Sequence, residues 1–213
     1  MDIALACVDW ERRKRAEKSL VEWVNTYCLG LVLDDAPPPK GEEVLRQMER
    51  SITAHSNFLL CLPRGAGKSC YTICTTLYAI ATGKQKFVVM VANNARSASG
   101  LLADLWRAIE DPTSAFSRDY PDVCLPFQLT NGSFRRKQLY NGMSTNISKT
   151  SSQIVLATLY TKDGKKLPKS GSIVVARGIT SGIRGLKHGT MRPTMVLLDD
   201  LQTSEVAENP ESV

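Results

Sequence analysis

The sequence lacks the features that mark membrane, zinc-binding or secreted proteins. Its apolar runs, such as residues 87–92 and 195–198, are far shorter than the roughly 20 residues that cross a bilayer. The six cysteines form no CxxC pair and the only histidines are His55 and His188, so no zinc site is expected. The basic cluster at residues 12–15 follows the apolar N-terminus, which is the wrong order for a secretory signal. We therefore expect a protein that is not secreted, has no membrane anchor and keeps its cysteines reduced.

Acidic residues are scarce in one long stretch of an otherwise ordinary composition. Of the 213 residues, 43% are hydrophobic and 23% charged, which excludes a disordered or fibrous chain and suits one domain with an added arm. The net charge is +6, and residues 129–192 hold twelve basic residues and one acidic residue, Asp163. This strip is either a surface for a polyanion or a solvated lysine-rich hairpin around residues 162–169.

Hydrophobic periodicity predicts an α/β fold. Helices are expected at residues 20–31, 42–55, 68–81 and 95–109. Strands are expected at residues 58–62, 86–92 and 195–198, with a hairpin formed by 153–160 and 172–177 and an irregular segment at 111–131. Strands that alternate with helices predict a mostly parallel sheet covered by helices. The strand at 195–198 is apolar without alternation, which places it inside that sheet, buried on both faces.

The most informative segment is LPRGAGKS at residues 62–69, which follows a predicted strand and opens a predicted helix. Gly65 and Gly67 let successive backbone N–H groups face an anion, and the helix N-terminus adds its positive end. Lys68 would reach the β- and γ-phosphates of ATP, and the Ser69 hydroxyl would contact Mg²⁺. Leucine stands where the usual pattern has its first glycine, so the alternative is a glycine turn that happens to precede Lys-Ser.

Three further residues are predicted to complete this site. Arg64 lies inside the loop, where its cation would stabilise charge on the γ-phosphoryl group; the alternative is an exposed arginine paired with a surface carboxylate. The apolar strand 195–198 ends in Asp199 and Asp200. We predict that Asp199 binds the metal and that Asp200 is the general base. The alternative is that these carboxylates cap the following segment.

Two segments carry a resemblance to a known family. LPRGAGKS, together with RGITSGIRGLKHGTMRPTMVLLDD at residues 177–200, resembles the ATPase part of the large terminase subunit of tailed bacteriophages. DYPD at 119–122 and residues 89–94 match that family in position and character. The resemblance implies a P-loop NTPase fold of the ASCE type, with a helical arm over 1–40, an ATPase domain over 41–213 and a basic β-hairpin insertion.

The function implied by this resemblance is that of a DNA-packaging motor driven by ATP and Mg²⁺. Such a motor works in the host cytoplasm, docks transiently on the portal protein of a procapsid, acts with a small terminase subunit, forms a homo-oligomeric ring and pumps double-stranded DNA. The family's nucleotide contacts carry over to Arg64, Gly65, Ala66, Gly67, Lys68 and Ser69. Its catalytic roles carry over to Arg64, Lys68 and Asp200, and its metal contacts to Ser69 and Asp199.

The sequence departs from the family at two places. The second acid is often glutamate there, whereas Asp200 sets the base about 1.5 Å further back. The family's chain continues into a coupling strand and a nuclease domain, but this sequence stops at Val213, as expected of a split gene, a shortened chain or a fragment. We expect no nuclease site, an unpaired sheet edge, slow hydrolysis and self-association. Two other functions remain: a non-catalytic nucleotide-binding fragment that docks to packaging partners, and an unrelated P-loop ATPase such as a helicase or small-molecule kinase.

Overall fold

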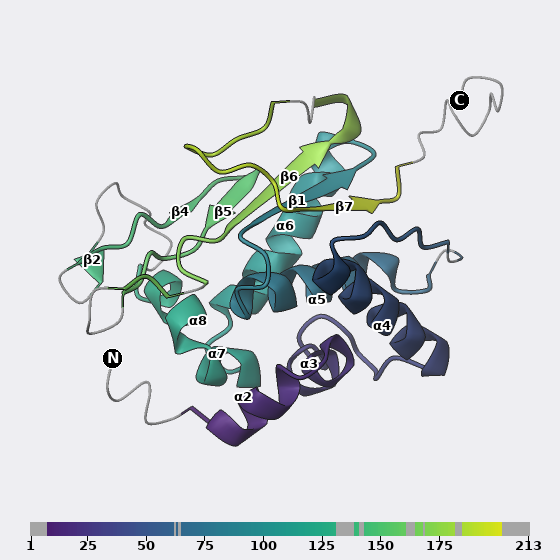
Figure 1. Cartoon of the computed structure of the whole chain (residues 1–213), viewed down its shortest axis with the longest axis horizontal. Coiled ribbons are helices and arrows are strands. Elements are labelled where there is room, and N and C mark those ends of the chain that lie inside the picture. Colours follow the sequence, from purple (N-terminus) through teal and green to yellow (C-terminus); the bar gives the residue numbers. More distant parts are fainter. Residues whose placement is uncertain are drawn as a thin grey trace.

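The computed structural model describes residues 8–61, 63, 65–130, 139–140, 143–160, 165–167, 169–181 and 185–201. The N-terminal part is mainly helical (Figure 1): α2 (Trp10–Ala16), α3 (Leu20–Tyr27), α4 (Pro39–Ala54), α5 (Lys68–Ala81), β1 (Phe87–Ala92), α6 (Ala95–Glu110), α7 (Ala115–Asp119) and α8 (Pro121–Gln128). The C-terminal part is mainly extended: β2 (Leu139–Tyr140), β3 (Met143–Ser144), β4 (Ser148–Lys149), β5 (Gln153–Val155), β6 (Ile173–Gly178), the 3₁₀ turn η1 (Ile179–Ser181) and β7 (Met195–Asp199). No helix among these is both long and apolar enough to cross a membrane.

The main sheet confirms the α/β class but is mixed. Its strand order is β4-β5-β6-β1-β7. The strands β6, β1 and β7 are parallel, whereas β4 and β5 join by antiparallel pairing. The predicted hairpin is confirmed, because β5 pairs with β6 in the register Val155↔Ile173. That hairpin makes the prediction of a mostly parallel sheet wrong, since its first arm continues the main sheet in the opposite direction.

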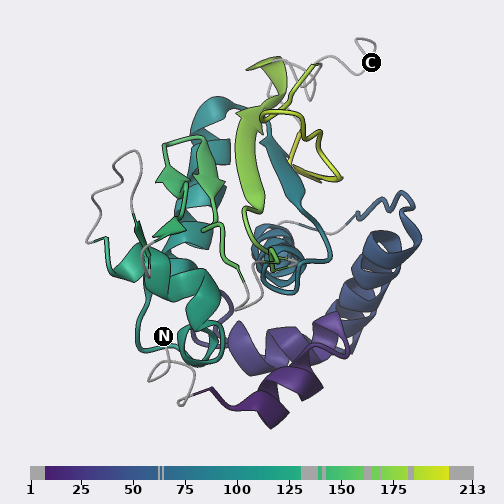
Figure 2. The same cartoon turned by 60° about the vertical axis from the view of Figure 1, so that its left-hand side comes forward.

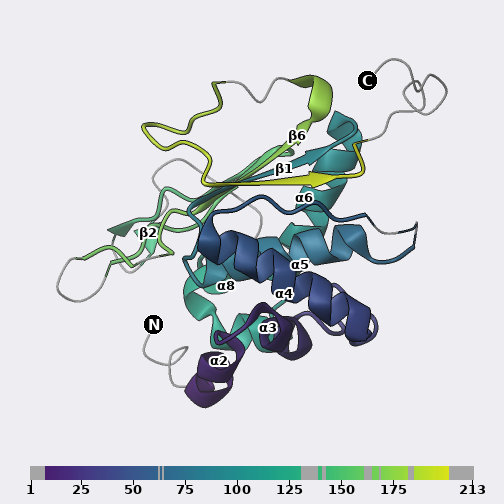
Figure 3. The ribbon, with the colours of Figure 1, turned by 45° about the vertical axis from the view of Figure 1, so that its right-hand side comes forward.

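The two faces of the sheet are covered differently. Alternate side chains of the central strands, such as Val88 and Met90, join one large core with α3 to α8. Figure 3 shows α3, α4, α5 and α8 on one side of the sheet and the chain around residues 186–194 on the other. On that second face, a smaller cluster of strand residues packs against Leu186 and Leu201. Within the described residues, helices therefore cover one face of the sheet.

Strand β7 lies at the edge of the sheet, so the prediction that residues 195–198 are interior is wrong for the described part of the chain. Its exposure alternates: Val196 is 47% exposed and Leu198 59%, whereas Met195 and Leu197 pack against the helix-covered core. The neighbouring β1 is equally apolar and buried at every position because it has a partner on each side.

Two local predictions are corrected. The strand expected at 58–62 is absent from its described residues, 58–61, where Leu59 is 86% exposed. This segment runs beside β7 in Figures 1 and 3 but pairs with no described strand. The segment 111–131, expected to be irregular, contains α7 and α8. Ser114 caps α7 through Ser117 N–H, and Pro121 occupies the first turn of α8, where its missing N–H costs nothing.

The N-terminal helices are tied to α7 by a buried aspartate. Figure 2 shows α2 and α3, in purple, on the same side of the sheet as α4 and α5. The carboxylate of Asp119 accepts hydrogen bonds from Arg12 Nε (2.7 Å), Arg12 Nη2 (2.7 Å), Tyr27 Oη (2.8 Å) and the backbone N–H of Asp9 (3.0 Å). Burial, together with the bond to Asp119, raises the pKa of Tyr27 above its ordinary value. The arm thus shares one core and one ionic network with the rest of the chain.

Candidate functional site

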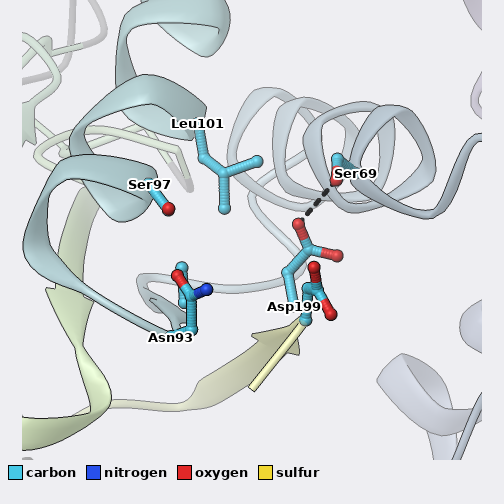
Figure 4. A pocket seen from close by; sticks show the side chains of 7 residues that line it. Ser69, Asn93, Ser97, Leu101 and Asp199 are labelled. Atoms are coloured by element: carbon cyan, nitrogen blue, oxygen red, sulfur yellow. Dashed lines mark hydrogen bonds between the residues drawn. The ribbon is translucent and has the colours of Figure 1, made fainter. Parts of the chain in front are cut away.

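The candidate site lies where two parallel strands end beside the start of a helix. Strands β1 and β7 are neighbours, and their register pairs Ala92 with Asp199, so both carboxyl ends open at the same edge. Helix α5 begins next to them and brings Ser69 to that edge (Figure 4). Ligands of α/β proteins bind at such carboxyl ends.

The glycine loop ahead of α5 has the backbone that its sequence predicts. Gly65 has φ +80° and Gly67 has φ +77°, which is the left-handed region that glycine enters without steric cost. A Cβ on Gly65 would have no atom within 4 Å, so the requirement for glycine there is conformational and not one of space. Gly67 is the N-cap of α5 and supplies no side-chain cap, so no N-cap side chain competes for the helix's first N–H groups.

Lys68, the first residue of α5, folds back over this loop. Its Nζ donates a hydrogen bond of 2.9 Å to the carbonyl of Pro63, which also accepts from Ala66 N–H at 3.4 Å. Lys68 is partly exposed, and this bond places its ammonium beside the glycine turn. Arg64, the predicted loop cation, lies outside the described residues.

The two halves of the predicted site meet through one hydrogen bond. Ser69 Oγ donates to Asp199 Oδ2 at 2.7 Å, across 130 residues of sequence. Asp199 is 7% exposed, and this is the one hydrogen bond that its carboxylate accepts within the described residues. A buried carboxylate with a single donor is poorly compensated for its lost hydration.

Asp200 has an unusual backbone. Its φ is +44°, a region that non-glycine residues seldom occupy and in which aspartate is enriched. Such conformations cost roughly 1 kcal/mol or more and concentrate at functional sites. Asp200 is exposed and lines the same cavity as Asp199, so the acidic pair divides into a buried and an exposed member.

A cavity of about 210 Å³ opens between these elements. It is lined by Ser69, Ala92, Asn93, Ser97, Leu101, Asp199 and Asp200. This volume is below the roughly 300 Å³ or more of sites that enclose a whole ligand, so it suits a phosphate group with water rather than a complete nucleotide.

Sequence reasoning missed Asn93. It is the first residue after the buried strand β1, so the rule that parallel strands present their functional residues at their carboxyl ends would have found it. Its Oδ1 is buried and has no hydrogen-bond donor among the described residues.

The turn that carries Asn93 is held by tight packing. Asn94 Oδ1 accepts from Ser97 N–H at 2.8 Å and so caps α6. A Cβ on Gly178 would stand 2.6 Å from Ala95 N and 2.7 Å from Asn94 C, so only glycine lets β6 approach this closely. The backbone that directly follows Asn93 is thereby held against β6 and the start of α6.

The donor atoms of the cavity suit a hard cation. They are the hydroxyl, carboxylate and amide oxygens of Ser69, Asp199, Asp200 and Asn93. Within the described ranges, no group of three or more His, Cys, Asp or Glu side chains could hold a metal by itself. Mg²⁺ usually takes one or two carboxylates and completes its shell with phosphate and water, so the residues present fit it.

The basic residues of the segment 129–192 differ in exposure: some are exposed, and one is buried against an acidic side chain. Lys165 and Lys166 are exposed. Lys169 is buried, and its ammonium contacts the Asp122 carboxylate and lies 5.1 Å from the centre of the Tyr120 ring. Burial lowers the pKa of Lys169, although Asp122 opposes the shift. The interpretation of a solvated hairpin is therefore wrong for Lys169; residues 135–137, 162 and 184 lie outside the described part.

The site is built from residues that lie far apart in the sequence. The structure brings together Ser69, Asp199 and Asp200 from distant parts of the chain and adds Asn93 to them. It sets Lys68 on the glycine loop at the start of the same helix. Comparisons with models of protein families, with curated proteins and with solved structures found no match to this chain.

Proposed function

We propose that this chain binds Mg-ATP at the cavity and hydrolyses it. The observation that carries the proposal is the 2.7 Å hydrogen bond from Ser69 Oγ to Asp199 Oδ2. It joins the end of a glycine loop with phosphate-binding spacing to the end of an apolar strand, across 130 residues. If the glycine turn were accidental, or if Asp199 only capped the following segment, nothing would require Ser69 and Asp199 to meet.

The binding roles follow from the types of donor present. The first N–H groups of α5 and the turn at Gly65 and Gly67 cradle phosphate oxygens. Lys68 exchanges its bond to the Pro63 carbonyl for the β- and γ-phosphates, a charge-assisted contact. Ser69 and Asp199 hold the metal, which supplies neutralisation of the phosphate charge.

The hydrolytic step needs one base and one water. The water oxygen forms a bond to the γ-phosphorus while the bond to the β,γ-bridging oxygen breaks and leaves its electron pair on ADP. The proton of the attacking water passes to the Asp200 carboxylate. Asp200 suits this role because it is exposed to the cavity, whereas Asp199 is buried and already bonded to Ser69.

The same proposal assigns the ATPase to a viral DNA-packaging motor, as a large terminase subunit. The segment at 177–200 and the arginine-containing loop support this assignment by resemblance. Double-stranded DNA, a portal protein and a small terminase subunit are then the partners. The exposed Lys165 and Lys166 agree with a contact to DNA phosphates.

Calorimetry of Mg-ATP binding tests the nucleotide site. Lys68→Ala should weaken binding roughly 10- to 100-fold, because a charged hydrogen bond is worth about 1.5–3 kcal/mol. Lys40→Ala, which removes an exposed lysine in the first turn of α4, is the matched control. Unchanged affinity in Lys68→Ala would show that the loop does not bind phosphate.

An assay of phosphate release, run beside the binding measurement, separates nucleotide binding from ATP hydrolysis. Asp200→Asn should keep the affinity for Mg-ATP and lower kcat roughly 100-fold or more, the usual worth of a general base. An equal loss of affinity and turnover would instead point to a structural role for Asp200.

A further inference from the structure

Asn93 and Asp200 occupy equivalent positions on neighbouring strands. Asn93 is the first residue beyond β1, and Asp200 is the first beyond β7. Because Ala92 pairs with Asp199, the two residues that follow leave the sheet side by side. Both side chains line the same cavity, which is large enough to hold water.

The amide oxygen of Asn93 needs a donor from the cavity. Its Oδ1 is buried and has no hydrogen-bond partner among the described residues. Asn25 Oδ1, on α3, is in the same condition, so an unpaired acceptor alone does not indicate function. What distinguishes Asn93 is that it lines a cavity that also contains two carboxylates. A buried acceptor that can reach water inside a polar cavity will bind it.

The position of Asn93 favours water over the metal as its partner. Figure 4 shows Ser69 and Asn93 on opposite sides of the Asp199 side chain. Ser69 bonds to Asp199 Oδ2 from the α5 side, which is the side assigned to the metal. Asn93 follows β1 and lines the same cavity as Asp200, the proposed base.

We propose that Asn93 orients the water that attacks the γ-phosphate, an inference that rests on the proposed ATP hydrolysis. The water donates one hydrogen to Asn93 Oδ1 and the other to the Asp200 carboxylate. Both hydrogens of the water are then hydrogen-bonded, and a lone pair of its oxygen points at the γ-phosphorus. The proton shared with Asp200 moves to that carboxylate as the new P–O bond forms, and the bridging oxygen leaves with its electron pair on ADP.

The test compares Mg-ADP with Mg-ADP plus aluminium fluoride, which mimics the transferred phosphoryl group with its attacking water in place. Asn93→Leu keeps the shape of the side chain and removes the acceptor; Asn93→Ser restores a smaller one. Asn25→Leu removes the other unpaired acceptor and is the matched control. The readouts are affinity for Mg-ADP, the gain in affinity with aluminium fluoride, and kcat.

We expect Asn93→Leu to bind Mg-ADP normally, to lose roughly 10-fold or more of the aluminium fluoride gain, and to lower kcat roughly 10- to 100-fold, because misplaced reactants cost rates of this size. Asn93→Ser should recover part of both, and Asn25→Leu should match the unaltered chain. An intact gain in Asn93→Leu, or a lost affinity for Mg-ADP in both Asn93 variants, would overturn the inference and leave ATP binding standing. Failure of the unaltered chain to bind Mg-ATP would overturn the proposed function, and the role of Asn93 with it.

Discussion

Two buried aspartates, Asp119 at the end of α7 and Asp199 at the end of β7, show how the same side chain serves different purposes. Asp119 is 0% exposed and its carboxylate is surrounded by donors from Arg12, Tyr27 and the backbone of Asp9. Asp199 is 7% exposed and, within the described residues, accepts a hydrogen bond from Ser69 alone. The first is compensated by the protein itself; the second retains acceptor capacity toward a cavity.

The number of hydrogen-bond donors around a buried carboxylate therefore distinguishes a structural aspartate from one in the candidate site better than its burial does. Removing water from a carboxylate costs several kcal/mol unless charge and hydrogen bonds replace it. Around Asp119 the replacement is complete, and the group fixes α2 and α3 against α7. Around Asp199 the replacement is partial, which is the condition expected of a group whose remaining partners arrive with a ligand.

The largest effect on stability is expected at Asp119. Asp119→Ala should lower the free energy of unfolding by roughly 3 kcal/mol, because Arg12 and Tyr27 lose their buried acceptor. Asp104→Ala, which breaks an exposed pair with Arg107 on α6, should change it by less than about 1 kcal/mol. Denaturant unfolding measures both, and equal losses would remove the distinction between the buried network and a surface ion pair.

A much smaller change in the free energy of unfolding is expected at Asp199, and its sign distinguishes Asp199 from Asp119. Asp199→Asn removes a buried charge and keeps an oxygen for Ser69, so the free energy of unfolding should stay the same or rise by up to about 1 kcal/mol. Asp119→Asn should be destabilising in the same assay. A large loss of stability in Asp199→Asn would mean that this carboxylate is structural, like Asp119.

The smallest effect on stability is expected at the exposed lysines, where the readout is DNA binding. Lys165→Glu with Lys166→Glu should leave the folded chain unchanged and reduce the slope of log affinity against log salt by about 2 or more. Lys169 is left intact because it is buried against Asp122. The control reverses Lys14 and Lys18, two exposed lysines of the arm. An unaltered slope, or an equal change in the control, would place any DNA contact elsewhere.

The local sequence pattern was sufficient to predict elements whose hydrogen-bond partners lie in the same helix or hairpin. The predicted helix at 68–81 is confirmed with the same bounds as α5, which begins directly after the glycine loop with Gly67 as its N-cap. The hairpin of β5 and β6 is confirmed because a turn-forming segment links two extended runs. The meeting of Ser69 with Asp199 was foreseeable only from the chemistry that requires both.

The features that the sequence did not predict depend on how distant segments of the chain pair and pack. Residues 87–92 and 195–198 are equally apolar, yet one is the interior strand β1 and the other lies in the edge strand β7, a difference set by neighbours and not by composition. Residues 58–61 are apolar and extended but find no described partner strand. Asn93 escaped notice because a single amide carries no motif; its role follows from its place beside Asp199.

The most direct measurement is calorimetric titration of ATP with and without Mg²⁺, in the unaltered chain and in Asp199→Asn. The account predicts that Mg²⁺ strengthens ATP binding roughly 10-fold or more in the unaltered chain and has little effect in the variant, since the metal loses its buried carboxylate. Without Mg²⁺, both chains should bind ATP equally within about twofold, a difference below 0.5 kcal/mol or so. A chain whose ATP affinity is indifferent to Mg²⁺, or an Asp199→Asn variant that keeps the full enhancement, would contradict it.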